Sequence, residues 1–416
     1  MAQINITLNQ EEILQLLKNN SQETFKLLLE NSLNEILKAE SAQQLQAEPY
    51  ERTAERTDSR NGHRERSLVT RIGKITLKVP RHRNVPFRSL IFDNYTRSEA
   101  ALIATMVEMV VNGVSTRKVS KVVEELCGCS FSKSTVSELC KELDEEVRNF
   151  RERPLTQEYP LVTVDATYFK AREGNKVVAK AMMIACATSS TGIREIIGFK
   201  VYDNESKENW RDFFSHLKER GLRGVILIIS DCHEGIRSAA GKEFPNAAWQ
   251  RCQRHFAENI IEDIPKKYQR GIANQLNEMF NSETIEEARA RRDEIIEEYE
   301  DVAEKAMKCL DEGFEEAMTI MELPKEMRKT HRTTNRIERL NRELKRRSNV
   351  ICIFPNEASI TRLIGAVLIE EHEKLISMSH HEFYKPAQEE LQKKLPQLRE
   401  IAREQQACLL YTSPSP

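Results

Sequence analysis

The stretch Leu161-Val162-Thr163-Val164-Asp165-Ala166-Thr167-Tyr168-Phe169 decides the fold of this 416-residue chain. It follows Pro160 and is rich in β-branched and aromatic residues, a composition typical of a β-strand. Two similar segments, residues 177–187 and 193–201, are separated by the turn pair Thr191-Gly192. The region therefore predicts three consecutive strands.

The pattern changes beyond this region. Residues 206–220 have the apolar spacing of an amphipathic helix. Residues 225–229 (VILII) form a continuous apolar run, typical of a strand that is covered on both faces. A short helix follows, and then a short strand at residues 247–249. Three strands, a helix, a strand, a helix and a strand is the order of a ribonuclease-H-like fold. We therefore predict an α/β protein whose ribonuclease-H-like mixed-sheet core begins with residues 155–255.

Residues 256–330 interrupt this α/β pattern. They are predicted to be almost purely helical and are acidic in their second half. We expect an all-α insertion there, and completion of the core by residues 331–407, which begin with a basic helix at residues 334–347. Residues 408–416 (CLLYTSPSP) lack periodicity and look like the translation of a sequencing-library adapter, so we expect them to be an artefactual tail.

The region before the sheet is predicted to be mainly helical. Residues 1–45 carry helical apolar spacing and predict N-terminal helices. Residues 46–150 contain Arg60-Asn61-Gly62, a turn signal, then an alternating basic strand pair closed by Pro80, and helices. Residues 132–137 place hydroxyls at a helix start, where they cap the helix and reach phosphates. A helix-turn-helix-like DNA-binding element has this pattern, and so does an ordinary helical hairpin.

Charge is segregated along the chain, although the formal net charge is −2. Residues 51–88 hold 11 Lys and Arg against 4 Asp and Glu, and residues 331–347 hold 7 against 2. Residues 283–316, between these blocks, hold 5 against 14. Either basic block could be a solvated face, but two of them favour nucleic acid, because basic side chains release counterions from phosphates.

Several classes of protein are disfavoured. The longest uncharged segment among the apolar ones, residues 181–193, is too short to span a membrane. We see no charged-then-apolar leader, so we expect a soluble, cytoplasmic protein without a membrane partner. The nine cysteines form no disulfide-like framework. Only Cys252-Gln-Arg-His255 has the spacing of metal ligands, and the second such pair that zinc needs is not evident.

Three acidic residues lie at positions where a carboxylate could have a functional role. Asp165 is in the middle of a strand, where a charge is costly unless it is paired, hydrogen-bonded or bound to a cation. Asp231 follows a buried strand, at the end where ligands bind in open α/β sheets. Glu338 lies in the basic helix. Each also has an ordinary role: a salt bridge for Asp165, a helix cap for Asp231, and an ion pair with Arg342 for Glu338.

Together the three carboxylates predict a site for divalent cations. Mg²⁺ prefers hard carboxylate oxygens and keeps several waters, so few protein ligands suffice. Two ions about 4 Å apart would activate an attacking water or 3′-hydroxyl and stabilise the leaving oxygen. Phosphoryl transfer mainly requires positioning and charge neutralisation. We expect the basic residues of the same helix to follow a DNA backbone: Arg336, Arg339, Arg342, Lys345, Arg346 and Arg347.

An ordered set of motifs resembles the bacterial Mutator-type, or IS256-type, DDE transposases. The resemblance runs from about Tyr50 to the C-terminal helices and includes the helical insertion between the second Asp and the Glu. The motifs are Tyr50-Glu51-Arg52, Arg60-Asn61-Gly62, Val79-Pro80-Arg81, Gly113-Val114-Ser115-Thr116-Arg117, Val164-Asp165-Ala166, Ile229-Ser230-Asp231-Cys232-His233-Glu234-Gly235, Trp249-Gln250-Arg251-Cys252-Gln253-Arg254-His255-Phe256 and Thr334-Asn335-Arg336-Ile337-Glu338-Arg339-Leu340-Asn341.

The resemblance implies a catalytic triad of Asp165, Asp231 and Glu338 that holds two Mg²⁺ or Mn²⁺ ions. It implies an insertion-sequence transposase that binds terminal inverted repeats, cleaves DNA to give 3′-hydroxyl ends and joins them to target DNA, working as a homodimer. It also places Cys252 and His255 in the active-site wall. The DNA contacts expected in the N-terminal region are Arg60, Arg81, Arg117 and Lys133.

Two other functions fit the same residues. A catalytically silent DNA-binding or regulatory derivative of a transposase is disfavoured by the intact acidic triad. A ribonuclease H or repair nuclease on the same fold agrees poorly with a flanking DNA-binding region. Asn335 and Asn341, three positions before and after Glu338, could orient its carboxylate, contact DNA or simply pack.

Overall fold

The structure, a computed structural model, describes residues 21–51, 53, 56–70, 72–89, 100–127, 131–377 and 385–412. Residues 1–20 of the predicted N-terminal helices and residues 413–416 of the predicted tail lie outside these ranges. The chain divides into two compact units, residues 1–142 and 143–416. In the described ranges we find no helix with the length and apolar character needed to cross a membrane.

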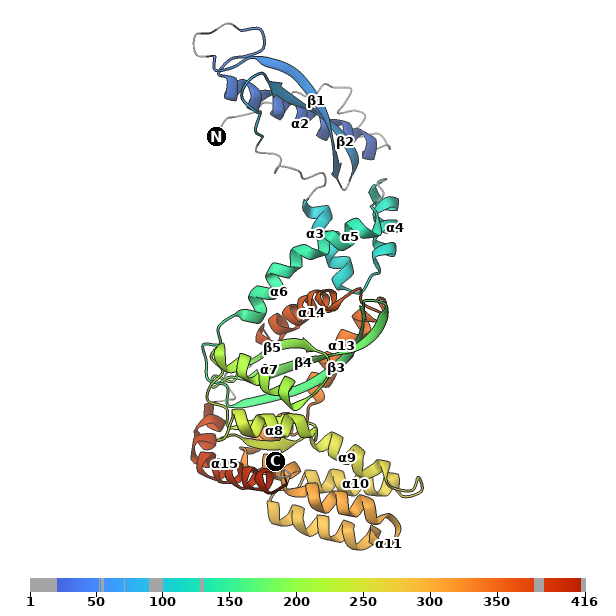
Figure 1. The fold of residues 1–416 in the computed structure, drawn as a ribbon, viewed down its shortest axis with the longest axis vertical. Coiled ribbons are helices and arrows are strands. Elements are labelled where there is room, and N and C mark those ends of the chain that lie inside the picture. Colours follow the sequence, from blue (N-terminus) through green and yellow to red (C-terminus); the bar gives the residue numbers. More distant parts are fainter. Residues whose placement is uncertain are drawn as a thin grey trace. The chain divides into compact units, whose positions relative to one another are not determined.

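The first unit contains a helix, a two-stranded antiparallel sheet and a group of short helices (Figure 1). The helix packs against the second strand through Leu37, Ile75 and Leu77, so the alternating apolar positions of the predicted strand pair form a small core. The elements are α2 (Ser21–Leu45), β1 (Arg60–Thr70), β2 (Gly73–His82), α3 (Ala100–Val111), α4 (Thr116–Cys127), α5 (Lys133–Leu139) and the 3₁₀ turn η1 (Cys140–Glu142).

Two predicted boundaries of the strand pair are wrong. Arg60-Asn61-Gly62 is no turn but the start of β1, where the register shifts before His63 and Gly62 has a φ of +72°. Glycine adopts this left-handed conformation without strain, so one sequence signal marks turns and bulges alike. Pro80 does not end β2, which continues to His82. Each strand of a two-stranded sheet has a free edge, and there a missing N–H is tolerated.

The predicted helix start at residues 132–137 is confirmed. Ser132 is the N-cap of α5, and its hydroxyl accepts a hydrogen bond from the Thr135 N–H at 3.0 Å. Val136 then packs into a small core with Val119 and Met106, on α4 and α3. Small hydroxyl residues therefore begin α5 by capping it.

The second unit is built on one mixed sheet, and the predicted order of strands and helices is confirmed (Figure 1). The strands lie in the order β5-β4-β3-β6-β7; β3, β4 and β5 are antiparallel neighbours, and β6 and β7 run parallel to β3. The elements are α6 (Leu143–Glu152), β3 (Leu161–Glu173), β4 (Lys176–Thr188), β5 (Arg194–Tyr202), α7 (Lys207–Glu219), β6 (Leu227–Ser230), α8 (Glu234–Glu243) and β7 (Ala248–Arg251).

Helices cover the sheet and enclose its main core. The apolar face of α7 places Trp210, Phe213 and Phe214 in one cluster with Val162, on β3, and Ile228, on β6. Helix α6 lies inside the range predicted for the DNA-binding region, yet it belongs to the second unit, where Asp144 accepts two hydrogen bonds from Arg362 at 2.7 Å. The apolar run at 225–229 supplies the first three residues of β6, a buried strand between β3 and β7, as its composition predicts.

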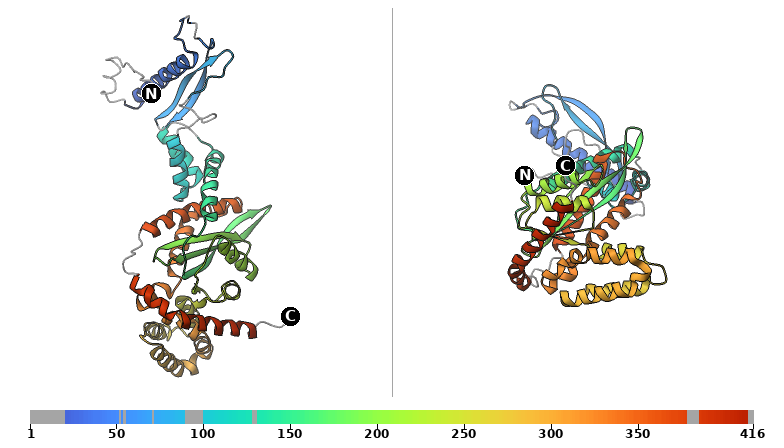
Figure 2. Two further views of the ribbon diagram at one scale, coloured as in Figure 1. Left: turned by 90° about the vertical axis from the view of Figure 1, so that its left-hand side faces the viewer. Right: turned by 60° about the horizontal axis from the view of Figure 1, so that its bottom comes forward.

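The insertion forms a helical layer of its own beside β7 (Figure 2). It has a separate core, to which α9 contributes Phe256, α10 contributes Leu276, and α11 contributes Leu310 and Phe314. The predicted helical character of residues 256–330 is therefore confirmed. Its elements are α9 (Gln253–Glu262), α10 (Gln269–Phe280), α11 (Ile285–Met318), the 3₁₀ turn η2 (Thr319–Glu322) and α12 (Lys325–His331).

Three helices complete the second unit: α13 (Asn335–Ser348), α14 (Glu357–Ser377) and α15 (Lys385–Thr412). Helix α13 contacts β3, and α14 contacts β3 and β5. Helix α15 packs along β7 and continues to Thr412, so the first residues of the predicted tail are helical.

His331, at the end of α12, is fully enclosed by the second unit. Its Nδ1 lies 2.9 Å from the Met327 carbonyl oxygen, which only accepts, so Nδ1 carries the hydrogen. Its Nε2 therefore accepts from the Thr188 hydroxyl at 3.0 Å. Burial lowers the pKa of His331 to about 4. The folded protein therefore holds this ring neutral at pH values where an unfolded chain protonates it.

Because the folded protein holds the His331 ring neutral, we predict that its free energy of unfolding falls in mild acid. Between pH 6.5 and 4 the unfolded chain binds a proton at His331 that the folded chain does not, so unfolding becomes easier as the pH falls, by roughly 3 kcal/mol over that range. Thermal unfolding midpoints of wild type and His331→Gln, measured from pH 8 to pH 4, check this. We expect a smaller pH-dependent loss in the variant, and parallel curves for the two proteins would contradict the prediction.

Candidate active site

Asp165 lies on β3, and the parallel pairing with β6 determines its neighbour. Val162 pairs with Ile228 and Thr163 with Ile229, and continuing this register by two residues brings Asp165 level with Asp231. Adjacent strands are about 4.8 Å apart, so the backbones of the two residues are neighbours across the sheet. Burial raises the pKa of Asp165 to about 7, with the negative charge of Asp231 as the second cause.

Two hydrogen bonds hold the Asp165 carboxylate. Its Oδ1 accepts from the Ala166 N–H at 2.9 Å, and its Oδ2 accepts from the Asn341 side-chain amide at 2.9 Å. Asn341 is buried on α13, the helix that carries Glu338. Asn341 therefore orients a carboxylate, as one of its three possible roles required, but the carboxylate belongs to Asp165 and not to Glu338.

Asp231 follows the last residue of β6 directly. Its Oδ1 accepts from the backbone N–H of His233 at 3.3 Å, and His233, which makes no side-chain capping bond, is the N-cap of α8. The ordinary interpretation of Asp231 as a helix cap is therefore wrong. The neighbouring Ser230 accepts a hydrogen bond from the Trp249 indole at 2.9 Å.

Glu338 lies on the first turn of α13 and is held on both oxygens. Its Oε1 accepts from the Thr334 hydroxyl at 3.2 Å, and its Oε2 accepts from the Arg254 guanidinium. The side chain is 16% exposed. The expected ion pair with Arg342 is replaced by this pair with Arg254, which α9 brings across from the insertion.

Cys252 and His255 lie beside Glu338. One ligand atom from each of the three residues falls within 4.8 Å of the others, and His255 Nε2 is 3.7 Å from Glu338 Oε1. Burial would raise the pKa of the Cys252 thiol, but hydrogen bonds with His255 and Thr334 outweigh it and lower that pKa. The bond with Cys252 raises the pKa of His255 to about 9, and the charges of Glu338 and Asp165 act in the same direction. His255 thus lies beside Glu338, and its positive charge is favoured by both carboxylates.

Glu205 is an acidic residue near this group that the sequence analysis missed. It follows β5, and burial raises its pKa, while a hydrogen bond from Tyr168 and the charge of His233 lower it. Its negative charge also raises the pKa of Asp165. In the sequence Glu205 stands one position before the N-cap Ser206, in a polar segment with the composition of an ordinary helix start, so no signal distinguished it.

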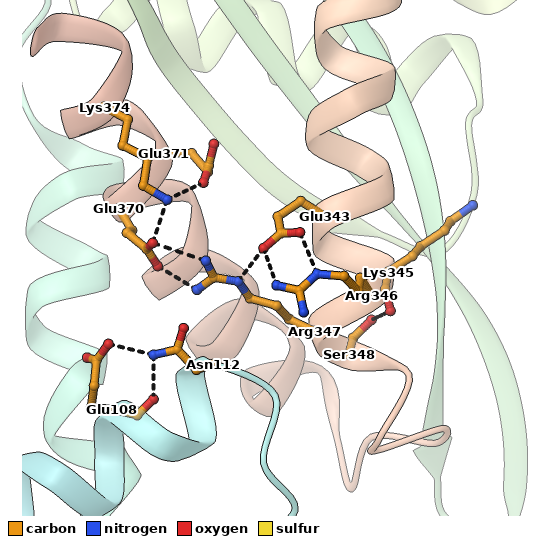
Figure 3. A network of polar contacts seen from close by, with 10 residues as sticks. All are labelled: Glu108, Asn112, Glu343, Lys345, Arg346, Arg347, Ser348, Glu370, Glu371 and Lys374. Atoms are coloured by element: carbon orange, nitrogen blue, oxygen red, sulfur yellow. Dashed lines mark hydrogen bonds and ion pairs between the residues drawn. The ribbon is translucent and has the colours of Figure 1, made fainter. Parts of the chain in front are cut away.

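Helix α13 presents its predicted basic residues on one face. Arg336, Arg339, Arg342, Lys345 and Arg346 are exposed, whereas the opposite face buries Ile337, Leu340 and Leu344. Arg347 is the exception: it is buried and forms ion pairs with Glu343 and with Glu370 of α14 (Figure 3). The expectation that Arg347 follows a DNA backbone is therefore wrong, because its guanidinium is used inside the fold.

The basic residues predicted in the first unit differ in their surroundings. Arg81, Arg117 and Lys133 are exposed. Arg60 donates to the carbonyl oxygens of Ala47 at 2.7 Å and Glu48 at 3.1 Å, so it ties β1 to the start of the segment that follows α2. The guanidinium of Arg60 therefore has a structural role, because it bonds to two backbone carbonyl oxygens.

Known transposases resemble this chain over most of its length. The sequence profile of "Transposase, Mutator family" matches residues 1–378. The chain is 43% identical to the transposase for insertion sequence element IS256 in transposon Tn4001 of Staphylococcus aureus, over 91% of this chain and 98% of that protein. It is 39% identical to the transposase for insertion sequence element ISRM5 of Rhizobium meliloti, over 84% of this chain and 88% of that protein.

A solved structure, the Drosophila P element transposase strand transfer complex, aligns with a TM-score of 0.29 and 10% identity, over 73% of this chain and 92% of that chain. That likeness is too distant to place any residue. The profile match and the two sequence relatives cover most of the chain, including all three acidic residues. The chain therefore belongs to the Mutator family of transposases.

Proposed function

We propose that this chain is the transposase of an insertion sequence that cleaves DNA at the ends of its element and joins the 3′-hydroxyl ends to target DNA, using Asp165, Asp231 and Glu338. One observation carries the proposal: the β3–β6 register brings Asp165 level with Asp231, and the Asn341–Asp165 hydrogen bond ties the helix of Glu338 to the same strand. Three residues that are far apart in the sequence thereby belong to one local structure.

The sheet supports a ribonuclease-H-like core as part of this proposal. Three antiparallel strands are followed by two parallel ones, in the order β5-β4-β3-β6-β7. Asp165 is on the central strand and Asp231 at the end of its parallel neighbour. In such sheets ligands bind beyond the carboxyl ends of the parallel strands.

The residues present fit divalent cations. Asp165, Asp231 and Glu338 offer hard oxygens. Burial raises the pKa of Asp165, the negative charge of Asp231 raises it further, and a bound cation would favour the charged form of this carboxylate. When bound, two Mg²⁺ or Mn²⁺ ions would supply activation of the attacking oxygen and stabilisation of the leaving oxygen. The protein's own contribution is orientation: Ala166 and Asn341 hold Asp165, and Thr334 holds Glu338.

The proposal is tested with duplex DNA that carries the inverted repeats flanking the gene. We expect strand cleavage that requires Mg²⁺ or Mn²⁺ and leaves 3′-hydroxyl ends. Cleavage of an RNA–DNA hybrid in preference to these ends would favour a ribonuclease H instead. End binding without cleavage by the wild type would favour the catalytically silent derivative.

The exposed face of α13 predicts a salt-dependent contribution to DNA binding. Each Lys or Arg that neutralises a phosphate contributes about 0.9 to the slope of log affinity against log salt. The double variant Arg342→Gln/Lys345→Gln should lower that slope by about 2, measured by fluorescence anisotropy from 50 to 300 mM salt (roughly the range over which such contacts weaken). Lys308→Gln, on the acidic α11, should leave the slope unchanged. An equal effect of both changes would count against α13 as a DNA-binding face.

Because two DNA ends must be brought together, the proposal includes a homodimer as the working unit. The first unit is proposed to bind the inverted repeats, with Arg81, Arg117 and Lys133 available at its surface. Arg60 is not included, because its guanidinium already bonds to two backbone carbonyl groups.

A further inference from the structure

We propose that Cys252 is a positioning residue for Glu338: its backbone holds the strand end that precedes Asp231, and its thiol holds the N-cap residue of the helix that carries Glu338. This inference rests on the proposed function and deepens it, because it gives the buried Cys252 thiol a role in orienting Glu338.

The backbone of Cys252 fixes one side of this link. Cys252 follows β7, whose last residue, Arg251, pairs with Ser230 at the end of β6. The Cys252 N–H donates to the Ser230 carbonyl oxygen at 2.7 Å. Ser230 directly precedes Asp231, so Cys252 has a fixed place relative to the second acidic residue.

The thiol fixes the other side. Cys252 Sγ accepts from the backbone N–H of Thr334 at 3.3 Å and lies 3.3 Å from the Thr334 hydroxyl. Thr334 is the N-cap of α13, and neither residue is exposed. The Thr334 hydroxyl in turn donates to Glu338 Oε1 at 3.2 Å. A hydroxyl has one hydrogen, so when it is donated to Glu338 the oxygen of Thr334 is left to accept from the Cys252 S–H.

The chain Cys252–Thr334–Glu338 thus sets the direction of one carboxylate oxygen. A second link between the same segments does not involve the thiol: the Gln253 N–H donates to the Arg332 carbonyl oxygen at 3.0 Å. Removal of the sulfur should therefore leave the path of the backbone in place and free the two groups bonded to the thiol, the Thr334 hydroxyl that holds Glu338 and the His255 ring beside it. Groups that orient a metal ligand typically contribute 10- to 100-fold to metal affinity.

The test compares Cys252→Ala, Cys252→Ser and Thr334→Val in the full chain, with Cys309→Ala on α11 as the matched control. Free Mn²⁺ is measured by electron paramagnetic resonance without DNA, and the Mn²⁺ concentration for half-maximal end cleavage is measured separately. We expect Cys252→Ala to weaken Mn²⁺ binding roughly 10-fold, and Cys252→Ser, which keeps a hydrogen-bonding group, to recover most of the affinity. Cys309→Ala should bind Mn²⁺ like the wild type.

Non-additivity separates a shared chain from two independent packing effects. Cys252 and Thr334 act through the same hydroxyl. The Mn²⁺ affinity of the double variant Cys252→Ala/Thr334→Val should therefore equal that of the single variant with the lower affinity. Three results would each overturn the positioning role. The double variant could lose affinity for Mn²⁺ by the product of the two single losses, Cys252→Ala could bind Mn²⁺ like the wild type, or Cys252→Ala and Cys252→Ser could lose equal affinity. Glu338→Gln provides the separate check of the proposed function. If this variant binds Mn²⁺ like the wild type, both proposals fail. If Glu338→Gln loses Mn²⁺ affinity and Cys252→Ala does not, only this inference is rejected.

Discussion

An Asp165→Asn variant should lose DNA-end cleavage by a factor on the order of 10³, because a metal ligand supplies several kcal/mol of transition-state stabilisation and each 1.36 kcal/mol is tenfold in rate. The amide has the shape of the carboxylate but not its charge, so binding of the inverted repeats should be unchanged. Single-turnover cleavage of end-labelled DNA and anisotropy measurements of binding check the two halves of this result. Asp301→Asn, on the acidic α11, is the control.

The same substitution should not unfold the protein. The pKa of Asp165 is raised to about 7 in the folded state, so the folded protein holds its proton to higher pH than the unfolded chain does. Stability from this group is therefore lost as the pH rises from about 4 to 7, and at pH 8 the charged carboxylate is a net cost without metal. We expect Asp165→Asn to have an unfolding midpoint at pH 8 at least equal to that of the wild type. Retained cleavage would reject the metal assignment of Asp165.

An Arg347→Ala variant should be the most destabilised of the changes considered. Arg347 is 5% exposed and donates to Glu343 at 2.7 Å and to both oxygens of Glu370, which Lys374 also contacts at 2.6 Å (Figure 3). Truncating one partner of a buried ion pair costs about 3–5 kcal/mol, and the partial exposure of Glu370 favours the lower end. We expect an unfolding midpoint roughly 5–10 °C below that of the wild type.

Arg346→Ala is a closely matched control for this prediction. Arg346 bonds to the same Glu343 at 2.6 Å but is 64% exposed, so water screens the pair and its loss should lower the unfolding midpoint far less than the loss of Arg347. The bond to Arg347 lowers the pKa of Glu370 to about 2, so this stabilisation is present above pH 4.5 and is lost as the pH falls toward 2. Equal effects of the two arginine changes at pH 7 would contradict the network.

The strands and the insertion could be predicted because apolar pattern and composition act locally. Residues 161–169 and 225–229 form β3 and β6 largely as their side chains require. The juxtaposition of Asp165 and Asp231 depends on the strand register, because Asp165 lies in the middle of β3 and comes level with the residue that follows β6 only through the β3–β6 pairing. The pair that Glu338 forms could not be predicted, because Arg342 and Arg254 offer the same chemistry, and only the packing of α9 selects Arg254.

Other errors have the same physical origin. Arg347 differs from Arg346 by one position on a helix, and that rotation turns one guanidinium inward and leaves the other in water. Arg60-Asn61-Gly62 has the local chemistry of a turn, but pairing with β2 makes it a bulge. Asn341 bonds to a strand 176 positions earlier, a partner that no local pattern identifies. Tertiary contacts decided each of these cases.

The Asn341–Asp165 bond also orders events during synthesis on the ribosome. The sheet with Asp165 and Asp231 can form while the insertion is still being translated, but the third carboxylate arrives only when α13 has left the exit tunnel. Contacts between such distant positions form late in folding. A nascent or prematurely terminated chain that ends before residue 335 thus carries the entire first unit without the complete acid set. Under the proposed function, such a chain would occupy DNA ends in competition with finished copies without cutting them.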